Sequence, residues 1–167
     1  MVKSKILHVN NYDYPKGGSD NYFLNLVKRL NNERNIEAKL FAPISKKSKE
    51  FNENLNKKIF VKDTKKNSLS FIFNIRSLIY FWLCIIKYKP DIVHFHIYYG
   101  QLTSSILIPL LFFKNIKIIQ TLHEYKLICP IHSSLNNKKY CIECSYGSYK
   151  SVITENCNSK GKLHSLG

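Results

Sequence analysis

A glycine pair and the residues around it form the first candidate site in this sequence. Gly17-Gly18 follows a short apolar run and precedes a helical pattern. Such a pair lets the backbone approach a ligand closely, and the helix that follows offers free N–H groups to an anion. A tight turn that needs positive φ angles explains the pair equally well. The G-x-G-x-x-G fingerprint of dinucleotide-binding loops is absent, so both interpretations stay open.

Histidines lie near the ends of two later apolar runs. His94 and His96 alternate with apolar residues, which places them on the same face of a strand. We expect His94 to be a buried core histidine and His96, nearer the loop, to be the better ligand contact. Two histidines at this spacing can also bind a metal ion, but no third ligand is evident nearby. His123 and Glu124 can bond a sugar hydroxyl, stabilise charge or orient an acceptor, or they are an ordinary polar loop pair.

Cysteines form a separate candidate site in the last third of the chain. Four of the five cysteines lie there: Cys129, Cys141, Cys144 and Cys157. The central two have the C-x-x-C spacing that lets two thiolates share one zinc ion, and the outer two flank them at similar distances. A segment with so few apolar residues gains much of its order from a metal. We therefore predict structural zinc, with disulfides and free thiols as the alternatives.

Short strand-like runs alternate with longer helical patterns ahead of these cysteines. Strands are expected at residues 5–10, 37–42, 59–61, 91–96 and 116–121. Helices are expected after an N-cap at Ser19, from about residue 68 to 88, and from 103 or 104 towards 113. The strands are too apolar for a one-sided sheet, so we predict an α/β, Rossmann-like parallel sheet with helices on both faces. Ligands collect at the carboxyl ends of such strands, which brings residues 11–18, 96–100 and 122–130 to one edge.

The composition is that of a packed but strongly basic protein. Apolar residues make up 44% of the chain, and 26 Lys and Arg against 11 Asp and Glu give a formal charge of +15. The lysines are spread along the chain and arginine is scarce, which argues against nucleic-acid binding. An anionic membrane surface and a general compositional bias explain the charge equally well. The N-terminus lacks a signal-peptide pattern, and residues 71–86 are too interrupted to span a bilayer, so we predict a cytoplasmic protein.

Three stretches together resemble glycosyltransferase family 4. They are residues 17–20, 90–96 and 120–130. The last stretch reads Q-T-L-H-E-Y-K-L-I-C-P and is the most specific. It is similar to the T-L-H-[DE]-Y-x-x-x-C-P stretch of a subgroup that works on capsular, lipopolysaccharide or related surface glycans. The resemblance covers essentially residues 5–157, with the motifs in the expected order.

The resemblance implies a GT-B fold of two Rossmann-like domains, a nucleotide-sugar donor, retention of anomeric configuration and no catalytic metal. It places Gly17 and Gly18 against the donor phosphate or the reacting sugar. His123 matches the family histidine that contacts the donor sugar near the reaction centre. It also implies that three residues line the binding site of the acceptor, a glycan or a lipid-linked sugar: His96, Tyr99 and Glu124.

We expect a departure from this family pattern, with no second Rossmann domain in these residues. We expect an acceptor-side domain at residues 1–128 and a cysteine-rich loop segment at 129–167. Such a chain is expected to be inactive alone, whether it is a truncated gene product, half of a split enzyme or an excised domain. The alternative function is a non-enzymatic, zinc-stabilised basic module that binds a membrane or a partner protein.

Overall fold

The computed structural model describes residues 3–44, 47, 58–61, 73–136, 139–147, 149–155 and 157. The chain divides into two compact units, Met1–Thr121 and Leu122–Gly167. The sequence pattern places the change of character slightly later, at Cys129.

A five-stranded parallel sheet forms the centre of the first unit, with the strand order β3-β2-β1-β4-β5. The strands are β1 (Ser4–Val9), β2 (Ile36–Pro43), β3 (Lys58–Val61), β4 (Ile92–Phe95) and β5 (Lys117–Gln120). The chain builds outward from β1 to β3 on one side and then returns to add β4 and β5 on the other. The order therefore reverses between β1 and β4, which is where ligands bind in sheets of this kind.

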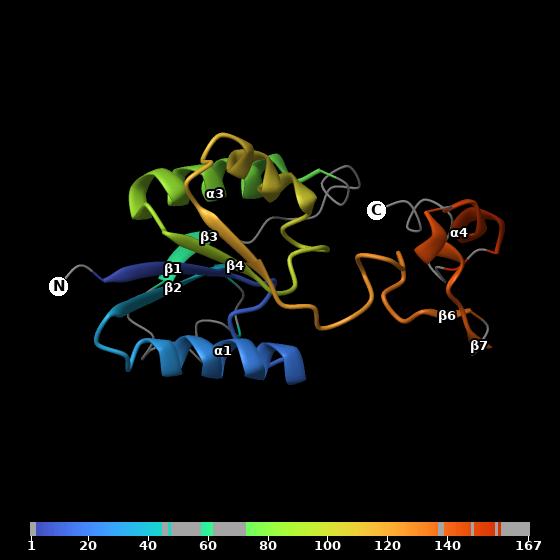
Figure 1. Cartoon of the computed structure of the whole chain (residues 1–167), viewed down its shortest axis with the longest axis horizontal. Coiled ribbons are helices and arrows are strands. Elements are labelled where there is room, and N and C mark those ends of the chain that lie inside the picture. Colours follow the sequence, from blue (N-terminus) through green and yellow to red (C-terminus); the bar gives the residue numbers. More distant parts are fainter. Residues whose placement is uncertain are drawn as a thin grey trace. The chain divides into compact units, whose positions relative to one another are not determined.

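Helices cover both faces of this sheet. Helix α1 (Gly18–Leu30) lies on one face, and α3 (Ile75–Tyr88) lies on the opposite face beside the 3-10 helix η2 (Ser104–Leu111) (Figure 1). Trp82 of α3 packs against the ring of Phe112, with 5.2 Å between the ring centroids. The predicted fold class, an α/β Rossmann-like parallel sheet, is confirmed.

Three details of the predicted helices are wrong. Helix α1 begins one residue before Ser19, and its N-cap is Gly17, which makes no side-chain cap. Helix α3 begins at Ile75, because the side chain of Asn74 accepts a hydrogen bond from Ser77 N and acts as the N-cap. Residues 68–72 of the predicted helix lie outside the described residues. The helix after Thr103 is a 3-10 helix with Pro109 inside it, and a proline cannot donate the backbone bond of an α-helix.

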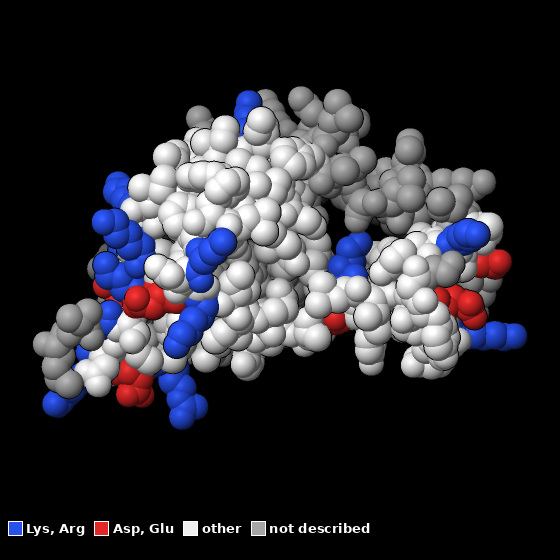
Figure 2. All heavy atoms as spheres, turned by 45° about the horizontal axis from the view of Figure 1, so that its top comes forward, with Lys and Arg blue, Asp and Glu red and all other residues white. Residues whose placement is uncertain are grey.

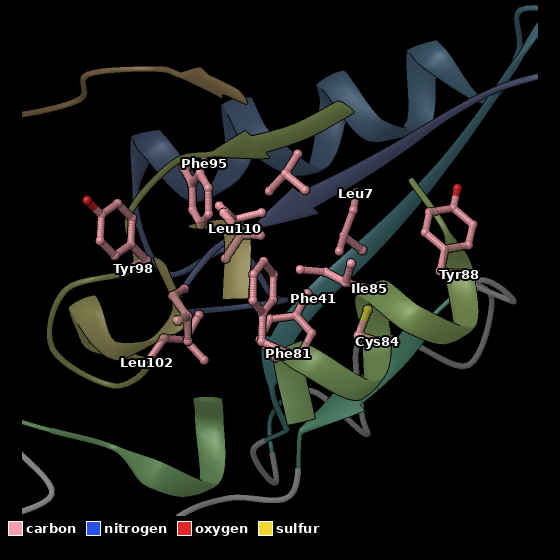
Figure 3. Close-up of a cluster of buried hydrophobic side chains, with 13 residues drawn as sticks. Leu7, Phe41, Phe81, Cys84, Ile85, Tyr88, Phe95, Tyr98, Leu102 and Leu110 are labelled. Atoms are coloured by element: carbon pink, nitrogen blue, oxygen red, sulfur yellow. The ribbon is translucent and has the colours of Figure 1, made fainter. Parts of the chain in front are cut away.

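Most of the apolar core lies on the α3 face. Thirteen buried residues form one cluster there, with Phe41, Phe81 and Phe95 from β2, α3 and β4 near its middle (Figure 3). The rings of Phe41 and Phe81 meet edge to face at 5.0 Å. The α1 face carries a smaller cluster of four buried residues: Phe23, Val27, Ala38 and Leu40.

The second unit has little regular structure and a small interior. It contains an antiparallel pair, β6 (Leu135–Asn136) with β7 (Lys139–Tyr140), the 3-10 helix η3 (Glu143–Tyr146) and the helix α4 (Lys150–Thr154). Its buried residues, among those described, are Ser134 and Val152. Apolar burial therefore contributes little to the order of this unit.

Candidate functional site

Two consecutive asparagines hold the loops together at the point where the strand order reverses. Asn10 follows β1 directly and is buried; its amide donates to Asp20 Oδ1 of α1 at 2.8 Å and its oxygen accepts from Ile97 N after β4 at 3.1 Å. Asn11 donates to Tyr99 O at 2.7 Å and accepts from Leu102 N at 3.3 Å. These bonds hold the β1 loop, the start of α1 and the β4 loop together at one edge of the sheet.

The glycine pair lies at the exposed start of α1, next to this edge. Gly17 is extended, with φ −155° and ψ −174°, and the described glycines with positive φ are Gly100 and Gly147. A Cβ built on Gly17 makes an ordinary contact, 3.8 Å from Asp20 Oδ2, and one on Gly18 has no described atom within 4 Å. A turn that requires positive φ therefore does not explain this pair. Neither backbone conformation nor packing within the described residues requires a glycine here.

The α1 face of β1 and β4 carries three histidines. His8 and His94 are register partners on adjacent strands, and His96 follows two residues after His94. One nitrogen from each ring lies within 4.8 Å of the nitrogens of the other two. Phe23 of α1 covers the group, with its ring 5.0 Å from that of His96. No third potential metal ligand is evident near His94 and His96 in the sequence, but the fold brings His8 to within this distance of both.

Burial differs among these histidines in a way the sequence does not indicate. His8 and His96 are fully buried, whereas His94 is half-buried and its Nε2 lies 2.7 Å from Thr121 Oγ1. Burial, assisted by the nearby His94, lowers the pKa of His8 to about 3, so His8 is neutral at pH 7. Its Nδ1 lies 3.3 Å from His96 Nε2, and its Nε2 is buried without a hydrogen-bond partner among the described residues.

Tyr99 belongs to the β4 loop of the same edge. Its carbonyl oxygen accepts from Asn11, and its half-buried ring lies 5.3 Å from the ring of Tyr98. Gly100, which follows, has φ +114°, a conformation that favours glycine. A Cβ at Gly100 would lie 3.6 Å from Asn11 Nδ2. The backbone at this loop is therefore fixed closely against the β1 loop.

His123 and Glu124 lie at the start of the second unit, and both are half-buried. Tyr125 donates from its backbone N–H to His132 O at 3.1 Å, and Cys129 N donates to Tyr125 O at 2.7 Å. This loop is thus folded back on itself by backbone hydrogen bonds. The roles of His123 and Glu124 stay predictions.

The comparison with protein families adds the decisive observation. A model of the family described as Glycosyltransferase Family 4 matches residues 16–141, which is more than half of the chain. The chain belongs to glycosyltransferase family 4. No curated protein and no solved structure shows significant similarity to it.

The matched range of this family 4 protein begins one residue before the glycine pair and ends at the first cysteine of the C-x-x-C pair. It therefore contains the start of α1, His94 of β4, His96 directly after this strand, and the loop with His123. His8 of β1 and the two asparagines that follow this strand precede it. Sequence reasoning missed His8 and Asn10 and included Asn11 only as part of the loop at residues 11–18, although two adjacent asparagines at the end of an apolar strand are a usable signal of a polar edge.

The four cysteines of the family 4 protein lie in its second unit as half-buried free thiols. Cys144 Sγ lies 4.0 Å from Ser151 Oγ, and Cys157 Sγ lies 3.7 Å from Ser151 O. Burial raises the pKa of Cys157, and the nearby Cys144, Cys141 and Cys129 raise it further. The four sulfurs therefore lie in one neighbourhood. They are not as close as the three histidines, which are the one described group of potential ligands within 4.8 Å of one another.

Proposed function

We propose that this chain is the acceptor-binding part of a retaining glycosyltransferase with a GT-B architecture. It moves a sugar from a nucleotide-sugar donor to a glycan or lipid-linked acceptor in surface-polysaccharide synthesis. The observation that carries the proposal is the glycine pair at the exposed start of α1, where neither φ nor the described packing calls for glycine. A ligand that approaches this backbone closely supplies the missing reason for two glycines.

The start of α1 suits a sugar diphosphate. Helix N-termini carry unpaired N–H groups and a partial positive charge, and both favour an anion. The carboxylate of Asp20, in the first turn of this helix, accepts a hydrogen bond from the side-chain amide of Asn10. This bond holds the Asp20 side chain against the β1 loop. In this proposal Gly17 and Gly18 contact the phosphate or the reacting sugar.

The remaining predicted residues divide between donor and acceptor. His123 contacts the donor sugar and stabilises charge on the departing diphosphate, while a second, donor-binding domain holds the nucleotide. Tyr99 and Glu124 line the acceptor side. His96 is fully buried, so its part in acceptor binding is to support the crevice wall beneath the exposed loops.

The reaction can be tested in an enzyme in which a donor-binding domain completes this chain. The assay follows transfer from a panel of nucleotide sugars and determines the anomeric configuration of the product by NMR. His123→Ala is expected to lower kcat/KM about 100- to 1,000-fold, the usual cost of removing one charge-stabilising donor. The matched control is His132→Asn, because His132 is exposed and has a positive φ that asparagine tolerates. Equal rates for the two variants, or an inverted product, contradict the proposal.

An apolar surface of α3 and η2 favours work at a membrane. We define this surface by its exposed residues: Ile75, Ile79, Tyr80, Leu83, Ile86, Leu111 and Phe112. Figure 2 shows a broad area without charged side chains on this side, with lysines and arginines gathered at one end of it. None of the helices in the described part of the chain has the length and apolar character that a bilayer span requires. We propose that this surface rests on the anionic cytoplasmic face of a membrane, where lipid-linked acceptors are anchored.

Vesicle flotation tests this placement. The chain is expected to bind vesicles that contain anionic lipid. The variant Ile79→Glu/Leu83→Glu is expected to lose most of that binding, because insertion of this surface would transfer two charged side chains from water into the bilayer. The matched control places the same charges on exposed positions of the opposite helix, Asn21→Glu/Asn25→Glu. Equal loss in both variants would indicate a general charge effect. Equal binding by all three proteins would exclude this surface.

We also propose a structural zinc ion at Cys129, Cys141, Cys144 and Cys157. The second unit buries only Ser134 and Val152 among its described residues, and a metal supplies order that apolar burial does not. Elemental analysis of protein purified without added zinc is expected to give one zinc that Cys141→Ser/Cys144→Ser removes. Zinc-free protein with an unchanged second unit would contradict this site.

The binding-module alternative differs from the enzyme in one measurable respect. A module that only binds membrane or protein has no use for a nucleotide sugar. Sugar transfer by the completed enzyme therefore distinguishes the two, because a chain that serves only as a binding module does not support the reaction.

A further inference from the structure

The three histidines on the α1 face form a set of potential metal ligands, a role that the proposed transfer reaction does not give them. His8, His94 and His96 come from two adjacent strands, and one nitrogen of each lies within 4.8 Å of the others. Imidazole nitrogens are preferred ligands of zinc, copper and nickel ions. A cluster of three in one apolar layer, beneath Phe23, needs an explanation beyond packing.

Distances in this cluster are close to those of a metal site. Zinc–imidazole bonds of about 2.0–2.1 Å in tetrahedral geometry place ligand nitrogens about 3.3–3.4 Å apart. His8 Nδ1 and His96 Nε2 are already 3.3 Å apart. Ring rotations bring the third nitrogen from at most 4.8 Å to the same separation.

The outer contact of one histidine also suits a metal. His94 places its Nε2 2.7 Å from Thr121 Oγ1. A histidine that ligates through one nitrogen typically gives the other to an oxygen in this way.

A hydrogen bond between His8 and His96 is the alternative account of the 3.3 Å contact. In either direction of donation His8 Nε2 stays buried without a partner among the described residues. An unsatisfied buried polar atom costs about 1–3 kcal/mol. A hydrogen bond between the two rings therefore leaves the cost of burying this nitrogen unexplained.

We propose that His8, His94 and His96 bind a divalent transition-metal ion of the zinc class. The ion joins β1 to β4 near their carboxyl ends, where the strand order reverses. Three protein ligands leave at least one coordination position, which water or an oxygen of a bound ligand fills. The half-buried His94 marks the side from which the ion reaches the cluster. The inference does not depend on the proposed transfer reaction.

The experiment must separate this site from the cysteines. The full chain with Cys141→Ser/Cys144→Ser is stripped of metal with a chelator and titrated with Zn²⁺, first by calorimetry and then by NMR of the histidine rings. One equivalent is expected to bind. The ring signals of His8, His94 and His96 are expected to shift together, while those of His123 and His132 stay in place. This NMR readout uses the native histidines, so it does not depend on a variant that fails to fold.

Two variants complete the test in the same Cys141→Ser/Cys144→Ser protein. His94→Gln removes the most exposed ligand and is expected to weaken binding by at least about 100-fold, whereas His132→Asn is expected to leave it unchanged. Thr121→Val keeps the shape of the side chain, removes the outer contact and is expected to weaken binding about 10- to 100-fold. No binding by the Cys141→Ser/Cys144→Ser protein, or binding that His94→Gln does not weaken, overturns the proposal. Zinc-induced shifts confined to His123 or His132 overturn it as well.

Discussion

The two faces of the sheet bury different kinds of side chain. The α3 face holds thirteen buried residues, almost all of them large and apolar. The ring of Phe81 contacts the rings of Phe41 and Phe95 there. The α1 face holds four buried apolar residues together with polar groups such as His8, Asn10 and Asp20. Both faces belong to the same strands, whose side chains alternate between them.

This difference separates stability from binding. Burial of large apolar side chains is the main favourable term in folding, so the α3 face supplies most of the stability of the first unit. The α1 face buries less apolar surface and so gains less stability from burial, because polar groups occupy part of it beneath the start of a helix. A sheet stabilised from one face can therefore carry a polar layer on the other, which is where we propose that ligands bind.

The largest expected effect on stability comes from a substitution in the core on the α3 face. Phe81→Ala removes a fully buried ring from the large cluster and is expected to lower the free energy of unfolding by about 3–5 kcal/mol. Phe23→Ala on the α1 face is expected to cost less, because water can enter a cavity lined by imidazoles. Urea unfolding of both variants measures the difference. Equal losses would show that the two faces contribute equally.

Thiol reactivity offers the next largest contrast. Burial on the α3 face raises the pKa of Cys84 to about 12, so little thiolate forms at pH 8. Alkylation of Cys84 is expected to be about a thousandfold slower in the native protein than in the unfolded one, given an ordinary thiol pKa of about 8.5. Chelators are expected to speed alkylation of the four cysteines of the second unit and to leave Cys84 unchanged. Rapid native alkylation of Cys84 would contradict the packing of α3.

A smaller loss is expected from the polar layer. Asn10→Ala removes the bonds to Asp20 and Ile97 N and is expected to cost about 1–3 kcal/mol, because it leaves buried polar groups unpaired. Asn21→Ala is the control, since Asn21 is exposed on the same helix that carries Asp20. Thermal unfolding followed by circular dichroism measures both. A loss no greater than that of Asn21→Ala would remove Asn10 from the framework of the site.

The sheet of the first unit could be predicted closely from the sequence. Apolar runs between polar loops gave all five strands within a residue or two, because buried parallel strands have few other patterns. Their continuous apolar character also predicted cover on both faces. The carboxyl-edge rule then directed attention to the loops with Gly17 and Tyr99.

What could not be predicted depends on contacts between distant residues. His8 looks like one polar residue in an apolar strand until the register places it beside His94. The start of α3 is set by Asn74, which also donates its backbone N–H to Thr103 Oγ1 on the loop before η2. Patterns within a short stretch of sequence do not indicate which distant residues the fold brings together.

The smallest expected change in stability discriminates best between the two accounts of the glycine pair. Gly18→Ala is expected to raise the free energy of unfolding by about 0.5–1 kcal/mol, because alanine favours a helix and its Cβ meets no described atom. The same methyl group occupies the space proposed for the sugar diphosphate, so transfer by the completed enzyme is expected to fall. Gly147→Ala is the matched control: its Cβ is equally unobstructed by described atoms, but φ is +82°, so alanine is strained and stability falls. If Gly18→Ala destabilises the protein as Gly147→Ala does, the pair serves the turn, and ligand approach loses its support.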